Sequence, residues 1–95
     1  MSNYIEQVRA NLAKRIDVEP ALLDLYTLLA IVRGTQTTYE DVHDAWSVWR
    51  NQTMPTHQSI VPFEELSKRV QSMDREYAEA IKETAREINP RNITF

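Results

Sequence analysis

Three residues of the segment YEDVHDAWSVWR, which spans residues 39 to 50, have types and a spacing that suit ligand binding. His43, Trp46 and Arg50 are three and four positions apart, so a helix brings them onto one side. A flat indole ring, an imidazole and a two-pronged cation together suit stacking on a base and gripping a phosphate. The same spacing also fits a buried Trp46 and an Arg50 in a surface ion pair, so both interpretations stay open. Trp49 is expected in the core.

The other residues that carry chemistry form neither a catalytic set nor a metal site. His43 and Asp44 form the dipeptide of HD-type phosphohydrolases, but no histidine precedes position 43. His43 and His57 are the only two histidines and there is no cysteine, so zinc ligands are too few. Ser59 lies near His57 without the glycines and the strand-turn-helix elbow of a serine nucleophile. We therefore expect no enzyme, no metal site and no cofactor.

Breakers of secondary structure are scarce, because the 95 residues include one glycine and four prolines. With apolar residues at helical spacing, this predicts an all-α fold, a compact bundle of about five helices in a single domain over residues 1–95. The first three helices are expected at about 3–16, 20–33 and 39–52. Pro20 suits the first turn of the second helix and Gly34 its left-handed cap, while Thr37 and Glu40 have capping-box spacing before the third.

The second half of the chain contains more turn residues. Residues 51–62, NQTMPTHQSIVP, end in an apolar run and are expected to form an ordered loop that crosses the core. A short helix or turn then extends to about Ser72, and Asp74 is expected to cap a last helix that ends near Ile88. The helix at 20–33 is apolar on nearly every side, so it is either the centre of the domain or part of a homodimer interface.

Charge and hydropathy exclude two classes of partner. The formal net charge is −3 and the basic residues are scattered among acids, which argues against nucleic-acid binding. The longest apolar stretch, ALLDLYTLLAIV, is about a dozen residues, too short to span a membrane. The lack of cysteine and of a signal-peptide pattern favours the cytoplasm.

The motif EDVHDAW, followed by HQSIVPFEELSKRVQSMDREYAEAIKETAREI, resembles the ryanodine-receptor-type repeat, the RyR domain, over about residues 40–88. The matching positions are Val42, His43, Asp44, Trp46, His57, Ser59, Ile60, Val61, Pro62, Phe63, Leu66 and Asp74. Gln58 stands where the RyR pattern has proline, and the loop before it is shorter than in the receptor repeats. The whole chain also resembles short proteins of actinobacteria and their phages.

The resemblance implies an RyR-like C-terminal half with its loop packed on the core that residues 3–33 share. It also implies a small non-enzymatic phage-type protein that binds or sequesters a nucleotide or nucleotide-derived signal in the cytoplasm of a bacterial host. The implied site lies between the third helix and the HQSIVPF loop and comprises His43, Trp46, Arg50, His57 and Ser59. The alternative is an interaction module that docks on a host protein, in which both histidines only hydrogen-bond the backbone to fix the loop.

Overall fold

The computed structural model describes residues 3–88, which form α-helices and 3-10 turns and contain no strand. The α-helices are α1 (Tyr4–Ala13), α2 (Pro20–Val32), α3 (Tyr39–Thr53), α4 (Lys68–Met73) and α5 (Arg75–Ile88). The 3-10 turns are η1 (Gly34–Gln36) and η2 (Phe63–Glu65). The predicted all-α class is thus confirmed. No helix in this range has the length and apolar character needed to cross a membrane.

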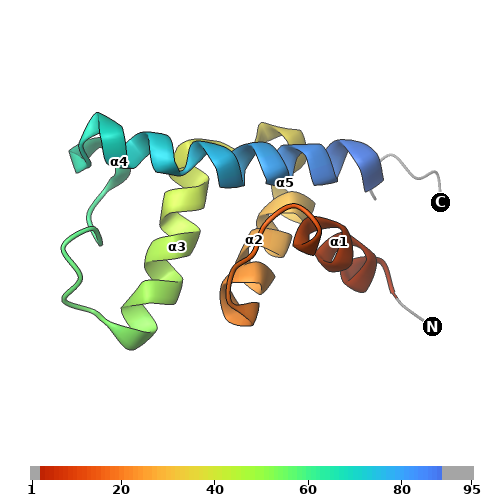
Figure 1. The fold of residues 1–95 in the computed structure, drawn as a ribbon, viewed down its shortest axis with the longest axis horizontal. Coiled ribbons are helices and arrows are strands. Elements are labelled where there is room, and N and C mark those ends of the chain that lie inside the picture. Colours follow the sequence, from red (N-terminus) through yellow and green to blue (C-terminus); the bar gives the residue numbers. More distant parts are fainter. Residues whose placement is uncertain (1–2, 89–95) are drawn as a thin grey trace.

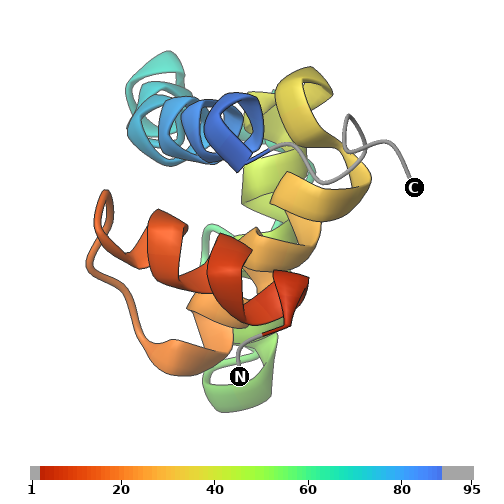
Figure 2. The same ribbon diagram turned by 90° about the vertical axis from the view of Figure 1, so that its right-hand side faces the viewer.

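The core lies where α2 packs against α1, α3 and α5. α4 and α5 follow one another along the long axis, with α3 and the α1–α2 pair below them (Figure 1). Seen from the side, α1 and α5 lie one above the other with α2 beside both (Figure 2). The buried apolar residues are Val8, Leu12, Ile16, Leu22, Leu23, Tyr26, Ala30, Val42, Ala78, Ala80, Ile81 and Ala85.

α2 occupies the central position, yet it is not buried on all sides. Leu22, Leu23 and Tyr26 face the core, whereas Leu28 and Val32 are 52% and 55% exposed. The apolar pattern around this helix therefore has two parts. One part forms the core, and the other lies on the outer surface of the molecule.

The capping box of α3 lies one residue later than the sequence pattern predicted. Thr38 is the N-cap: its hydroxyl accepts the Asp41 N–H at 3.0 Å, and the Asp41 carboxylate accepts the Thr38 N–H at 2.9 Å. The predicted pair of Thr37 and Glu40 is wrong because the Thr37 hydroxyl donates to the Gly34 carbonyl at 2.8 Å. Gly34 has the predicted left-handed conformation, with φ of 55°.

The loop of residues 54–62 is ordered, as predicted, but it does not cross the core. It runs outside α3 at one end of the molecule (Figure 1), and none of its residues is buried. Local backbone hydrogen bonds shape it, including His57 N–H to the Met54 carbonyl and Ile60 N–H to the His57 carbonyl. Ile60 and Val61, near its end, are only half-buried, because α2 and α5 already fill the inner side of α3.

Candidate functional site

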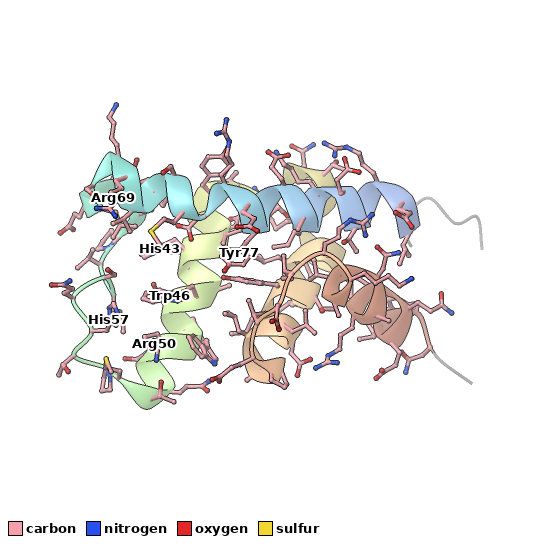
Figure 3. All side chains as sticks on the ribbon, in the orientation of Figure 1. His43, Trp46, Arg50, His57, Arg69 and Tyr77 are labelled. Carbon is pink, nitrogen blue, oxygen red and sulfur yellow. The ribbon has the colours of Figure 1, made fainter. Side chains whose placement is uncertain are left out.

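A cleft of about 700 Å³ lies between α3, the α1–α2 connection and the junction of α4 with α5. All five residues of the predicted site line this cleft: His43, Trp46, Arg50, His57 and Ser59. Figure 3 shows the first three along α3, with His57 opposite them on the loop that leads to α4. The fold therefore brings together the two segments on which the sequence placed the site.

Aromatic contacts order the α3 wall of the cleft. His43 and Trp46 stack with ring centroids 5.8 Å apart and an interplanar angle of 20°. His57 packs edge-on against Trp46, with centroids 5.2 Å apart and an angle of 81°. Such offset and edge-to-face arrangements are the favoured geometries for aromatic pairs. The contact of His57 with Trp46 also fixes the loop against α3.

Each histidine uses one ring nitrogen to hold the loop. His43 Nε2 donates to the Val61 carbonyl at 2.6 Å, so the proton is on Nε2, because a carbonyl oxygen can only accept. His57 Nδ1 accepts the Ser59 N–H at 3.0 Å, which places the proton of the neutral ring on Nε2. The backbone bonds of the structural alternative are thus present. Within residues 3–88 they leave one nitrogen of each ring without a hydrogen-bond partner.

Arg50 is held by an aromatic ring. Its guanidinium carbon lies 4.3 Å from the centroid of the Trp49 ring, a cation–π contact. Its Nε is buried and has no hydrogen-bond partner among the described residues. No described acid pairs with Arg50, so the surface ion pair that the sequence allowed is not found there. Trp49 packs partly against the core and also lines the cleft, so its expected core position holds only in part.

The inner end of the cleft contains polar groups that are not part of the predicted site. Tyr26 on α2 is fully buried, and its hydroxyl has no hydrogen-bond partner among the described residues. Its ring centroid is 5.6 Å from that of Tyr77 on α5. Asp74 is half-buried, and within residues 3–88 no hydrogen bond reaches its carboxyl group. Tyr26, Asp74 and Tyr77 all line the cleft.

The pKa values show that these inner groups interact. Burial raises the pKa of Asp74 from 3.8 to about 6, against an opposing effect of nearby His43. Burial, followed by the negative charge of Asp74 and by Tyr77, raises the pKa of the Tyr26 hydroxyl far above its ordinary value. Tyr26 therefore stays a neutral O–H donor, while Asp74 changes charge near neutral pH.

The predicted capping role of Asp74 is wrong. Its backbone is right-handed helical, with φ of −80° and ψ of −11°, whereas an N-cap residue is extended so that its side chain can reach the first N–H groups. Within residues 3–88 no backbone N–H at the start of α5 donates to its carboxyl group. Ser67 was the overlooked signal, because it caps α4 by accepting the Val70 N–H at 3.3 Å. The Asp74 carboxyl group is thereby free to face the cleft.

The cleft is acidic on balance. Asp17, Glu19, Asp74 and Glu76 face a single cation, Arg50. A multiply charged anion would meet repulsion everywhere except beside Arg50. No group of three metal-ligating side chains gathers in the part of the chain that the structure describes.

The chain belongs to the DUF7701 family, described as a domain of unknown function, whose family model matches residues 1–86. A comparison with curated proteins and another with solved structures give no match. The similarity to the RyR domain and to actinobacterial and phage proteins stays a prediction from the sequence.

Proposed function

We propose that this DUF7701 protein is a non-enzymatic binding protein for a nucleotide or nucleotide-derived signal, acting in the cytoplasm of a bacterial host. The observation that carries the proposal is the convergence of Trp46, His43, His57 and Arg50 on one cleft. The buried Arg50 Nε has no partner among residues 3–88. Aromatic faces accept a base, and a guanidinium grips a phosphate with two parallel hydrogen bonds. The RyR-like motif supports the same class of ligand.

The size and charge of the cleft narrow that class. About 700 Å³ lies within the range of small-molecule sites. One arginine among four carboxyl groups suits a ligand with a single phosphate, because further phosphates would approach the acids at the rim. Nucleoside monophosphates and cyclic mononucleotides are therefore expected to bind more tightly than triphosphates.

Calorimetric titration with nucleoside mono-, di- and triphosphates and cyclic nucleotides tests the proposal. Intrinsic fluorescence gives a second readout, because both tryptophans, Trp46 and Trp49, line the cleft. Saturable binding with quenched emission is expected. No heat and no change in emission with any nucleotide would refute the proposed function.

Arg50→Ala should weaken binding by about 10- to 150-fold, the loss of one charge-assisted hydrogen bond of about 1.5–3 kcal/mol. Arg50→Lys should recover only part of the loss, because an ammonium group lacks the two-pronged geometry. The matched control is Arg69→Ala, since Arg69 is exposed on α4 (Figure 3) and does not line the cleft. The control should bind as the wild type does.

A groove between α1 and α2 favours the second candidate function, docking on a host protein or on a second copy of the chain. This outer groove has a volume of about 520 Å³ and is lined by Ile5, Leu28 and an Arg9–Asp24 ion pair of 2.6 Å, among others. Ile5 and Leu28 are 38% and 52% exposed. Clustered apolar surface of this kind is typical of protein contacts.

A further inference from the structure

We infer that the inner end of the cleft selects a guanine base, whose hydrogen-bonding edge is read by Asp74 and Tyr26. The inference rests on the proposed function and assigns the base that the nucleotide carries. It starts from one buried and one half-buried polar group that line the same cleft and that have no hydrogen-bond partner in the described part of the chain.

The Tyr26 hydroxyl is the first of these groups. The side chain is 0% exposed, and a buried hydroxyl without a hydrogen bond destabilises a protein. Phenylalanine would provide the same ring contacts with Tyr77 without this cost. A hydrogen-bond acceptor on a bound ligand would explain why a hydroxyl is present at this position.

The Asp74 carboxyl group is the second. Besides burial, its negative charge raises the pKa of Tyr26, and nearby His43 acts to lower the pKa of Asp74 itself, yet no hydrogen bond joins it to either residue. In the ionised state its two oxygens only accept hydrogen bonds, whereas the Tyr26 O–H can donate one. The residues that line the cleft thus include one group with two acceptor oxygens and one group with a donor hydroxyl.

Guanine carries the complementary edge. Its N2 amino group and N1–H donate side by side, and its O6 accepts next to them. Adenine offers one donor group beside an acceptor nitrogen, so one carboxylate oxygen would stay unpaired. Uracil would place a carbonyl oxygen against the carboxylate. A site built to hydrogen-bond a ligand rejects an analogue that leaves its buried polar groups unpaired.

The rest of the cleft fits a mononucleotide in this direction. His43, which is near enough to Asp74 to lower its pKa, marks the inner end of the α3 wall. Arg50 lies seven positions further along α3, about 10 Å at 1.5 Å per residue. This is the scale of a nucleoside monophosphate from base edge to phosphate. Trp46 lies between the two, beside the path of the base and sugar.

Titration with the 5′-monophosphates of guanosine, inosine, adenosine and uridine at pH 8, where Asp74 is ionised, tests the inference. Guanosine monophosphate should bind at least about tenfold more tightly than the adenosine and uridine forms. The inosine form lacks only the N2 amino group and should fall between them. The difference between guanosine and inosine monophosphate therefore measures the contact of the N2 amino group with the Asp74 carboxylate in the wild-type protein.

Asp74→Asn provides the matched substitution. An amide presents one donor and one acceptor, the pattern that pairs with adenine, so the guanosine-to-adenosine affinity ratio should fall by at least about tenfold. Asp44→Asn is the control, because Asp44 is exposed on α3 and does not line the cleft. It should leave the ratio unchanged.

The outcomes separate this inference from the proposed function. Equal affinity for the four monophosphates, or an unchanged ratio in a folded Asp74→Asn variant, would overturn guanine selection while nucleotide binding stands. If Asp74→Asn does not fold, the comparison of guanosine with inosine monophosphate decides the matter in the wild type. Absence of binding by every nucleotide would refute the proposed function and the inference together.

Discussion

Replacing Tyr26 by phenylalanine should stabilise the free protein and weaken its ligand binding. The side chain is completely buried, and its hydroxyl has no hydrogen-bond partner among the described residues. An unsatisfied buried polar group costs about 1–3 kcal/mol, and phenylalanine keeps the ring and its contact with Tyr77. We take the lower end of this range because Tyr26 lines a cleft. The free energy of unfolding should therefore rise by about 1 kcal/mol.

Chemical and thermal denaturation measure this change. For a domain of 95 residues, 1 kcal/mol corresponds to a rise in melting temperature of about 4–8 °C. The urea midpoint should rise at an unchanged slope, because the surface exposed on unfolding stays the same. Tyr4→Phe is the control, since Tyr4 is 53% exposed, and it should change stability by less than about 0.5 kcal/mol.

The opposite sign would refute the reasoning. If Tyr26→Phe lost about 1 kcal/mol or more, the hydroxyl would have a hydrogen-bond partner in the free protein. The Tyr26 hydroxyl would then not be available to donate a hydrogen bond to a base. If stability rose but the affinity for guanosine monophosphate stayed the same, the hydroxyl would be unpaired without contacting the base.

The remaining predictions concern proton linkage and assembly. Because burial raises the pKa of Asp74 from 3.8 to about 6, its stabilising contribution is fully present below about pH 4 and is lost as the pH rises to about 6. The full pKa shift corresponds to about 3 kcal/mol of stability. Because the group is only half-buried, solvent screening reduces the expected loss to about 1 kcal/mol. The loss is measured as the difference between the urea midpoints of the wild type and Asp74→Asn across about pH 4–7. If the outer groove binds a second copy, sedimentation should show a species above 11.1 kDa that Leu28→Lys returns to monomer. A wild-type protein that stays at 11.1 kDa at high micromolar concentration would contradict the homodimer.

The sequence predicted most of the helices and one wall of the cleft for clear physical reasons. The breakers Pro20 and Gly34 mark the two ends of α2, as expected. Helical spacing placed His43, Trp46 and Arg50 on one side of α3, and all three line the cleft. Such patterns are local, because one helix determines which of its own residues share a side.

The parts that the sequence missed depend on packing between distant segments. Tyr26 lies on the helix that the sequence predicts to be apolar on nearly every side, and no local pattern shows whether a buried hydroxyl finds a partner. The sequence predicts Asp74 to be a cap, because an aspartate before an apolar stripe usually is one. Its helical backbone conformation depends on how α4 continues into α5, which no local pattern shows. The contact of Arg50 with its neighbour Trp49 was also unexpected, since adjacent residues on a helix point in different directions.

Three polar groups that lack hydrogen-bond partners in the described part of the chain lie together in the fold. Among residues 3–88, the Tyr26 hydroxyl, the half-buried Asp74 carboxyl group and the Arg50 Nε have no hydrogen-bond partner, and each destabilises the free protein. All three residues line the same cleft. In the Thr38–Asp41 capping box, by contrast, the polar groups satisfy one another. Violations that gather at one place are characteristic of functional sites. A ligand that supplies the missing partners would remove all three costs when it binds, which is why the cleft, and not the outer groove, carries the proposed function.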